Sequence, residues 1–565
     1  MTSTKLRWIP ACRLHELPVG GSRLLKTGDH RIALFRTEKE IFGVDNACPH
    51  EGYPLVQGEL KGCVLTCIWH NFKFDVQTGA CLMGDEDVRV WPVRVVDDLV
   101  EVGIDDRPPS LDSFWASLEK GLQQRRVGQV ARDVARLLKA GVSTDQLLGY
   151  AAVYDARRAE WGTTHALALA ADLRRYQHHP EPVLSLMQVF ELIAETHVRR
   201  PERERPEPRF TTATPEQVAE RLRKLVEEEQ AGEAEALMLG ALNRGWGPRE
   251  IEPMLFGLCA DHFLSFGHAL IYTTKVCELL THAGWEEHAA PVLGSLVFRI
   301  ANGTREDLLP HWAGWRKRLA ALDLSSLWTA RIRGGPPSWN RQQLGQTLTH
   351  ARPADAFTAL VDALGQGIPP SDLLDLLALG ACERMLRLDL RHDRDPAVQN
   401  GWLDVTHILT FAVAVREAVE RWDDPRALRL IFQLLHFVNH SKVLDGPPQA
   451  VVRERGDLSA ALGRGDVDAA VGIAAASDPE AVFELLLDLP LRDVATRPIV
   501  VTHLIKTTLA ARTLWRELQG EPGAGLPLLA TVRFYGAPKD ERFLQRRVHD
   551  AVGLVDGGRI PRSLT

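Results

Sequence analysis

The sequence predicts an α+β multidomain protein in which a small antiparallel β domain precedes a large all-α domain. The chain has 565 residues, well beyond the roughly 250–300 at which a single hydrophobic core stops growing, so more than one domain is expected. As far as residue 104, short β-branched and aromatic segments alternate with turns and predict strands. From residue 111 onward, long segments rich in Ala, Leu, Arg and Glu carry apolar residues three and four positions apart and predict helices.

The β domain is expected to span residues 1–106. Residues 31–36 and 40–44 flank a polar turn and predict a hairpin. A proline-rich linker is expected at 107–112. Further strands are predicted at 62–66, 88–93 and 99–104.

The helical region, residues 113–565, is expected to consist of about four divergent repeats. Each predicted unit has a helix that ends at a turn, a capped second helix, a third helix that opens on a histidine, and a closing fourth helix. Because helical repeats bury their apolar faces on their neighbours, a solenoid or a closed ring of helical hairpins is expected. The charged, proline-broken segment 199–208 predicts a solvated linker between two helical blocks. The units span about 113–198, 212–325, 339–445 and 455–565, and their histidines are His165, His268, His407 and His503.

Composition and charge argue against several classes of partner. The net charge of -7 and the lack of a basic stripe argue against nucleic-acid binding. The first ten residues lack the apolar core of a secretory signal, and no apolar run is long enough to cross a membrane, so we expect a cytoplasmic protein with no membrane partner. Six of the eight cysteines show no framework spacing, which is typical of reduced intracellular thiols.

The most informative motif lies in the β domain and pairs one cysteine with one histidine twice. Cys48 stands with His50 and Cys67 stands with His70, and sixteen residues separate the two pairs. Two thiolates and two neutral imidazoles are the ligands of a [2Fe-2S] cluster in which each iron receives one kind of donor. Tetrahedral zinc is the alternative for two Cys and two His, although zinc fingers usually pair like with like at short spacing.

On these residues, the segment from about 5 to 105 resembles the Rieske ferredoxin family. The resemblance implies that Cys48 and Cys67 hold the buried iron, and that His50 and His70 hold the outer iron and form the electron exit. It departs from the family at Ile68, where Pro is usual, and at Asn71, where Gly is usual. The first motif lacks the extra cysteine of respiratory Rieske proteins, so the soluble ferredoxin type is the better match.

The helical repeats suggest a second metal site. Each unit places an acidic residue near the end of its second helix, before the histidine of the third. If rotation relates the repeats, these groups converge, and four imidazoles with four carboxylates would suit one or two non-haem iron ions. The alternative is structural, because a buried histidine is commonly satisfied by a carboxylate on an adjacent helix. The candidate pairs are Asp155 with His165, Asp261 with His268, Glu383 with His407, and Asp493 with His503, and weaker candidates are His262, His436 and His440.

Other reaction templates do not occur in the sequence. It contains no dinucleotide fingerprint, phosphate-binding loop or serine-hydrolase elbow, so an external NAD(P)H-dependent reductase or a ferredoxin is expected to supply electrons. The first hypothesis is an oxidoreductase whose Rieske cluster passes electrons to a metal centre in the helical region, as an oxygenase of a small organic substrate would require. The second is an electron-carrier domain on a helical scaffold that docks a partner enzyme. A third is another metal-dependent reaction for which the cluster is a redox sensor.

Overall fold

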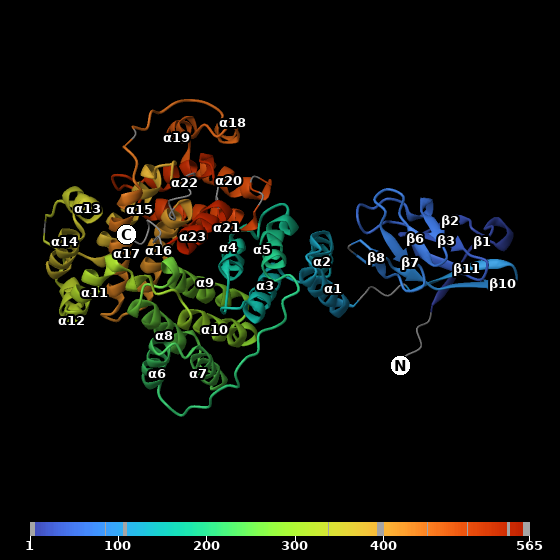
Figure 1. Ribbon diagram of the computed structural model, residues 1–565, viewed down its shortest axis with the longest axis horizontal. Coiled ribbons are helices and arrows are strands. Elements are labelled where there is room, and N and C mark those ends of the chain that lie inside the picture. The colour runs from blue at the N-terminus through green and yellow to red at the C-terminus, as the bar shows by residue number, and fades with distance from the viewer. Residues whose placement is uncertain are drawn as a thin grey trace. The chain divides into compact units, whose positions relative to one another are not determined.

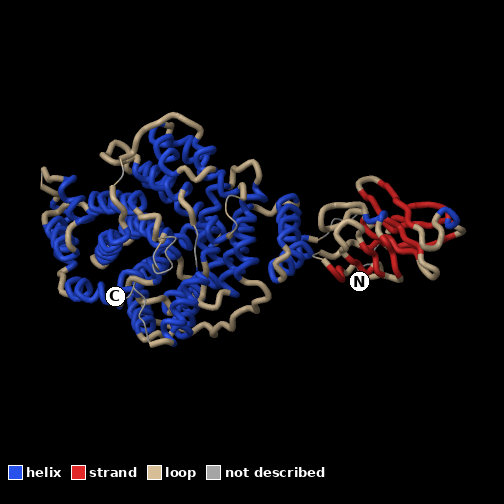
Figure 2. The backbone as a smooth tube through the Cα atoms, turned by 45° about the horizontal axis from the view of Figure 1, so that its top comes forward, coloured by secondary structure: helices blue, strands red, loops and turns tan. Residues whose placement is uncertain are grey.

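The computed structural model describes residues 6–84, 86–105, 110–336, 338–392, 401–448, 450–493, 495, 497–539 and 543–557. By its internal contacts the chain divides into two compact units, Met1–Ser143 with Ile193–Arg200, and Thr144–Leu192 with Pro201–Thr565. Strands occur in the first unit and helices build the second (Figures 1 and 2). The predicted fold class is confirmed, and the first unit also contains two helices, α1 and α2, which follow the β domain. Part of the predicted linker, 107–109, lies outside the described residues, and α1 already begins at Leu111.

The described part of the β domain forms three antiparallel sheets, with strand orders β1-β11-β10, β2-β3-β4-β9 and β5-β6-β7-β8. The predicted hairpin is formed by β3 and β4, in which Phe35 pairs with Phe42. The strands are β1 Arg7–Arg13, β2 Ser22–Thr27, β3 His30–Arg36, β4 Ile41–Asp45, β5 Glu59–Lys61, β6 Val64–Thr66, β7 Lys73–Asp75, β8 Cys81–Met83, β9 Val90–Trp91, β10 Val93–Val96 and β11 Leu99–Ile104.

Strand β3 is buried on both faces and separates two apolar clusters. Because successive side chains of a strand point to opposite faces, Ile32 and Leu34 join one cluster, whereas Ala33 and Phe35 join the other. The second cluster also contains Cys48 and Cys67. The core of the β domain therefore holds both cysteines of the motif.

The helices of the chain are α1 Leu111–Gln123, α2 Val127–Lys139, α3 Thr144–Arg158, α4 His165–Leu173, α5 Pro182–Thr196, α6 Pro215–Glu227, α7 Ala231–Asn243, α8 Pro248–Asp261, α9 His268–Ala283, α10 Trp285–Ala301, α11 Ala313–Ala320, α12 Leu324–Ala330, α13 Arg341–His350, α14 Pro353–Gly365, α15 Pro370–Arg387, α16 Trp402–Arg421, α17 Ala427–His440, α18 Leu458–Gly463, α19 Val467–Ala476, α20 Pro479–Asp488, α21 Pro498–Glu517, α22 Leu526–Gly536 and α23 Phe543–Val555. Short 3₁₀ turns join several of them, including η4 Ser265–Gly267, η5 Glu306–Leu308, η6 Pro310–Trp312 and η9 Leu489–Leu491.

Four helices, one from each predicted repeat unit, form a closed ring inside the second unit. Helix α4 packs on α9, α9 on α16, α16 on α21, and α21 on α4. Each carries one of the four histidines. His165 and His268 begin their helices as expected, whereas His407 and His503 are the sixth residues of α16 and α21, because these two helices start one turn earlier.

The segment 199–208 is mostly exposed, and it is irregular after residue 200, as its charge and prolines predict, but two of its arginines reach into the second unit. Arg203 donates to both carboxylate oxygens of the fully buried Glu235, at 2.7 and 2.8 Å. Arg205 donates to the carbonyl oxygens of Ala156 and Pro291. These two arginines therefore satisfy acceptors of the second unit, whereas Glu202, Glu204 and Glu207 are exposed.

Within the described residues, none of the helices combines the length and the apolar content that crossing a membrane requires.

Candidate functional sites

Two loops of the β domain bring the two Cys-His pairs together. The first ligand loop, residues 46–54, follows β4, and the second ligand loop, residues 67–72, joins β6 to β7. Both are closed in the same way. In the first loop, the amide of Cys48 donates to the carbonyl of Tyr53, and the carbonyl of Cys48 accepts from the amide of Gly52, each at 2.8 Å. In the second loop, the amide of Cys67 donates to the carbonyl of Phe72 at 2.8 Å, and the carbonyl of Cys67 accepts from the amide of Asn71 at 3.0 Å.

The fourth residue after each cysteine has a left-handed backbone, with φ of 77° at Gly52 and 61° at Asn71. Asparagine is among the non-glycine residues that adopt this conformation most readily. The departure from the family pattern at Asn71 therefore preserves the loop. Ile68, where the family usually has Pro, is exposed and fills no core position.

Of the four side chains, the two cysteines are buried and the two histidines lie at the surface. Cys48 and Cys67 are 3% and 2% exposed, and the Nδ1 atoms of His50 and His70 lie 3.1 Å apart near the surface. Burial raises the pKa of Cys48 to about 11, so a thiolate here needs a bound cation to replace its lost hydration. Phe72 stacks on His50. Two buried sulfur donors and two accessible nitrogen donors fit a [2Fe-2S] group, whose charge stabilises both thiolates.

These loops define an iron-sulfur protein of the Rieske class. Residues 7–92 match the Rieske [2Fe-2S] domain family, and through this domain the chain belongs to that family, as the resemblance predicted.

The relatives described next match a part of this chain about as long as the β domain. The ferredoxin component of the naphthalene 1,2-dioxygenase/salicylate 5-hydroxylase systems of Ralstonia sp is 34% identical over 90 residues, which cover 16% of this chain and 86% of the relative. The anthranilate 1,2-dioxygenase ferredoxin subunit of Burkholderia cepacia is 32% identical over 104 residues, 18% of this chain and 96% of the relative. The terminal oxygenase of carbazole 1,9a-dioxygenase from Nocardioides aromaticivorans is 26% identical over 18% of this chain and 32% of its own, with a TM-score of 0.17.

A second candidate site lies inside the ring of α4, α9, α16 and α21, where the four histidines meet. The Nε2 atoms of His165 and His268 are 3.0 Å apart, and these two residues and His407 offer ligand atoms within 4.8 Å of one another. The ring of His503 lies 5.0 Å from that of His165 and 5.1 Å from that of His407. We call these four residues the four-histidine cluster.

Backbone carbonyls orient three of the four imidazoles. The Nδ1 atom of His503 donates to the carbonyl of Ile499 at 2.7 Å, and His268 and His407 donate in the same way to Ser265 and Leu403. Since a carbonyl only accepts, each of these rings carries its proton on Nδ1 and directs the lone pair of Nε2 away from its own turn. Metal-binding histidines are held in this way.

Burial keeps the cluster uncharged. Burial has the largest effect on the pKa of these histidines, and the nearby Lys506 ammonium has the second largest. Together they lower the pKa of His268 to about 3 and hold the pKa of His165, His407 and His503 well below the usual value. His503 is 1% exposed, and its Nε2 atom has no hydrogen-bond partner among the residues that the structure describes. A buried acceptor without a partner is costly, so this nitrogen is suited to a ligand that the chain itself does not supply.

Lys506 and Tyr272 are polar neighbours of the cluster that the sequence reasoning missed. The Nζ atom of Lys506 donates to Nε2 of His407 at 2.9 Å, and the hydroxyl of Tyr272 lies 3.3 Å from Nδ1 of His165. Burial lowers the pKa of Lys506 to about 7. The available signal for Lys506 was its position three residues after His503, which places both on one face of α21.

A small cavity is lined by residues of the same four helices. Its volume is about 70 Å³, enough for a few water-sized molecules and too little for an aromatic ring. Lys506 lines it together with small and apolar side chains such as Ala168, Thr410 and Ala510. Lys275, Asp172 and Glu417 also contribute, so the lining is charged as well as apolar.

The predicted carboxylates do not join the four-histidine cluster, and this part of the prediction is corrected. Asp155 accepts from the hydroxyl of Thr163 and the amide of Thr164, at 2.7 and 2.9 Å. Because Thr164 caps α4, Asp155 holds the turn that positions His165. Its role is therefore supporting.

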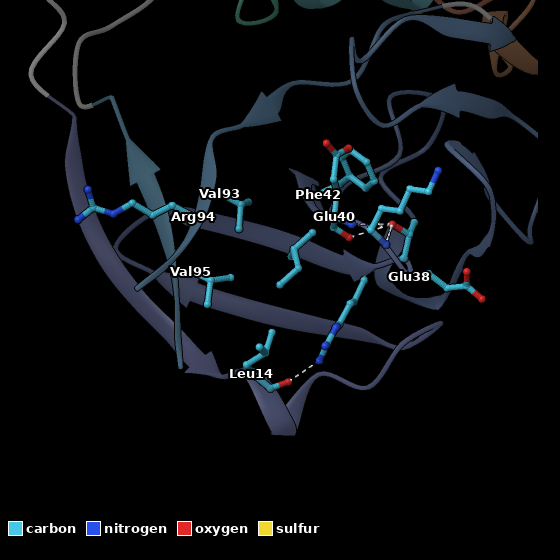
Figure 3. Close-up of a pocket in the computed structure, with 11 residues that line it drawn as sticks. Leu14, Glu38, Glu40, Phe42, Val93, Arg94 and Val95 are labelled. Atoms are coloured by element: carbon cyan, nitrogen blue, oxygen red, sulfur yellow. Dashed lines mark hydrogen bonds between the residues drawn. The ribbon is translucent and has the colours of Figure 1, made fainter. Parts of the chain in front are cut away.

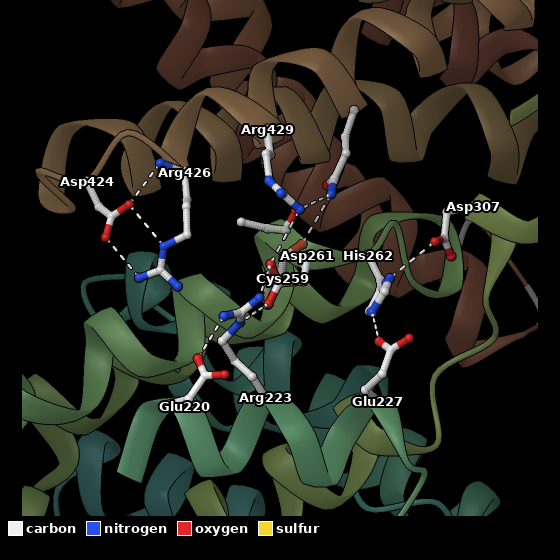
Figure 4. Close-up of polar contacts among 12 residues, drawn as sticks. Glu220, Arg223, Glu227, Cys259, Asp261, His262, Asp307, Asp424, Arg426 and Arg429 are labelled. Carbon is white, nitrogen blue, oxygen red and sulfur yellow. Dashed lines mark hydrogen bonds and ion pairs between the residues drawn. The ribbon is translucent and has the colours of Figure 1, made fainter. Parts of the chain in front are cut away.

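The other three acids are engaged elsewhere. Asp261 pairs with Arg223 at 2.6 Å and with Arg429 at 3.6 Å (Figure 4). Glu383 accepts from His350 and Arg387. Asp493 is exposed in the turn after η9. Within the described residues, none of these three carboxylates belongs to the group formed by His165, His268 and His407.

The weaker candidates also lie outside the four-histidine cluster. His262 bridges two carboxylates, with Nε2 2.5 Å from Glu227 and Nδ1 3.2 Å from Asp307 (Figure 4). His436 and His440 meet His311, which the sequence reasoning did not single out.

The β domain also has an open hollow of about 480 Å³, lined among others by Leu14, Glu38, Phe42 and Val93 (Figure 3). No residue of either ligand loop lines it. This hollow is therefore separate from the [2Fe-2S] site.

Proposed function

We propose that this chain is an oxidoreductase in which the Rieske [2Fe-2S] cluster supplies single electrons to a non-haem metal ion, preferably iron, bound by His165, His268, His407 and His503. The observation that carries the proposal is the convergence of four neutral imidazoles in a buried helix ring, in a chain that also contains a Rieske domain. An electron-transfer domain joined to a helical unit requires an acceptor, and this cluster of donors is suited to hold one.

The donor set favours one ion over two. Paired metal ions are usually bridged by carboxylates, and the described residues place no carboxylate in the group formed by His165, His268 and His407. Imidazole nitrogen suits iron, copper, nickel and zinc, and of these, iron fits a chain that already handles iron in its cluster. A bound iron would supply dioxygen activation, which consumes electrons delivered one at a time.

The chain's own residues have distinct tasks in this proposal. The carbonyls of Ser265, Leu403 and Ile499 hold three imidazoles in the tautomer that binds a metal through Nε2. Lys506, with its pKa lowered to about 7 by burial, can be present as the neutral amine and then does not repel a cation. The cavity beside it, of about 70 Å³, has room for a molecule of the size of dioxygen.

The partners proposed are an external NAD(P)H-dependent reductase or ferredoxin and a small organic substrate. The matched relatives are named as ferredoxin components of aromatic dioxygenase systems, which supports an electron-transfer role for the β domain here. His50 and His70, at the surface, are the proposed point at which electrons leave the cluster.

The test is the iron content of anaerobically purified full-length protein. Acid-labile sulfide counts the clusters, each of which contains two iron atoms, and total iron above that number belongs to the helical site. We expect about one extra iron per chain. The double variant His268→Ala/His407→Ala should lose it and keep the electron paramagnetic resonance signal of the reduced Rieske cluster. His282→Ala, which changes an exposed histidine on α9, serves as the control and should keep the extra iron.

A second candidate function is an electron carrier whose helical unit docks a separate enzyme. It is favoured by the coverage of the relatives, because this chain matches 86% to 96% of two stand-alone ferredoxin proteins. Only two iron atoms per chain, with unchanged turnover by a redox partner in the His268→Ala/His407→Ala variant, would support this function and exclude the first.

A further inference from the structure

A second group of three histidines lies in the helical unit, on other elements than the four-histidine cluster. His436 and His440 are one turn apart on one face of α17, and His311 lies in the short turn η6. The Nδ1 atom of His311 is 3.0 Å from Nε2 of His436, and all three residues offer a nitrogen within 4.8 Å of the others. We call these residues the three-histidine group.

The three rings are tightly arranged. They are parallel to within 5°, and the ring centroids of His311 and His440 are 3.8 Å apart. Trp312 and Trp315 pack on His436, with ring centroids at 3.8 and 4.8 Å. Two bulky indoles thus fix the most buried imidazole of the group, which is 3% exposed.

His311 and His436 share a hydrogen bond through these nitrogen atoms, and the third imidazole lies beside them. Among the residues that the structure describes, no carboxylate contributes to this group. Burial lowers the pKa of all three histidines, that of His311 to about 4. The imidazoles are therefore neutral near pH 7, and a cation bound by their nitrogen lone pairs would replace the His311–His436 hydrogen bond.

We propose that His311, His436 and His440 bind a divalent transition-metal ion of the borderline class, such as zinc, cobalt, nickel or copper. Neutral imidazoles at helical i, i+4 spacing with a third from a separate segment are suitable ligands for these ions. Because His311 is exposed and His440 half-buried, a fourth position is open to solvent. The site uses none of the residues of the proposed iron centre and stands independently of the proposed function.

A bound ion would join two segments that are far apart in sequence. It would tie η6, and with it the start of α11, to the C-terminal end of α17. A ligand that binds only the folded state stabilises it. Metal binding at this group should therefore raise the unfolding temperature of the helical unit.

The experiment titrates the full-length protein with Co²⁺ after anaerobic dialysis against a chelator that leaves the Rieske spectrum unchanged. Co²⁺ reports its coordination through visible absorption bands. The variants His311→Ala and His440→Ala change the two more accessible ligands, so that the core around His436 is retained, and His282→Ala is the matched control. Circular dichroism and the Rieske spectrum verify that each variant is folded.

We expect the wild-type chain and the control to bind one more Co²⁺ than either variant, or to bind this ion at least tenfold more tightly. Mutation of residues that only support a metal ligand already changes metal affinity by about 10- to 100-fold, so loss of a ligand should have at least this effect. The Co²⁺-dependent rise in unfolding temperature should be lost in both variants. Iron at the four-histidine cluster should be the same in all four proteins, which separates this result from the outcome for the proposed function. Equal Co²⁺ stoichiometry and affinity in the wild type and both variants would overturn the proposal and leave a metal-free stack of imidazoles.

Discussion

Glu306 should reduce the stability of the helical unit above neutral pH, and its replacement by Gln should remove that cost. The side chain is 4% exposed in η5, and its Oε2 atom accepts from the amide of Phe266 at 3.1 Å. Burial raises the pKa of Glu306 from 4.5 to about 7. Phe266, with φ of 56°, belongs to the turn immediately before His268, so the bond also supports the four-histidine cluster.

The sign and size of the effect follow from linkage. Between pH 4.5 and 7 the folded protein retains a proton on Glu306 that the unfolded chain has lost, so stability falls as the pH rises through this range. A rise of pKa from 4.5 to about 7 corresponds to a cost of at most about 3 kcal/mol once both states are ionised. Glu306→Gln keeps an oxygen acceptor for Phe266 without the charge. Its gain over the wild type should thus be near zero at pH 4.5 and up to about 3 kcal/mol at pH 8.

The assay is urea unfolding of both proteins at several pH values between 4.5 and 8, followed by tryptophan fluorescence. Asp307→Asn is a control with the opposite sign. Although burial alone would raise it, hydrogen bonds from His262 and Arg305 lower the pKa of Asp307 to about 2. Asp307→Asn should therefore lose stability by a similar amount at pH 5 and pH 8. A gain for Glu306→Gln that does not change with pH, or a loss at pH 8, would refute the reasoning.

Two further substitutions test the turn before α9 and the cluster ligands. Gly267 and Gly245 have nearly the same backbone, with φ of 83° and 82°, but an added Cβ would lie 2.5 Å from Phe411 at Gly267 and would meet open space at Gly245. Gly267→Ala should therefore destabilise the protein by about 1–3 kcal/mol more than Gly245→Ala in chemical denaturation. Equal losses would show that the contact with Phe411 does not matter. Cys48→Ser should abolish the visible absorption and the electron paramagnetic resonance signal of the [2Fe-2S] cluster without changing the circular dichroism of the helices, and a retained signal would contradict ligation by Cys48.

Local signals predicted the β domain and the helical class well. Strand alternation located β3, β4 and β11, and the Cys-His spacing predicted the Rieske family that residues 7–92 match. Asn71 shows how far such reasoning extends. The sequence showed a departure from the usual glycine, but only the backbone φ of 61° shows that the departure keeps the same conformation.

The carboxylate part of the second site could not be predicted from the sequence, because it depends on partners far along the chain. Asp261 lies seven residues before His268 but is held by Arg223 from α6 and Arg429 from α17. The carboxylate of a residue near a helix end can pair with any basic side chain that the fold places beside it. The spacing of residues in the sequence does not indicate which basic side chain that is. Lys506 was missed for a related reason, since lysine is rarely fully buried.

The same physical feature links the two candidate redox sites. In a Rieske cluster, replacing anionic thiolates by neutral imidazoles raises the reduction potential. As proposed ligands, Cys48 and Cys67 would still give the Rieske cluster two anionic donors. The four-histidine cluster instead offers neutral imidazoles, and backbone carbonyls have the orienting role that carboxylates often have. A metal ion in the helical site would accordingly be the better electron acceptor, and electrons would flow to it from the cluster. A redox titration that gave the helical site the lower potential would contradict this direction of transfer and favour the electron-carrier function.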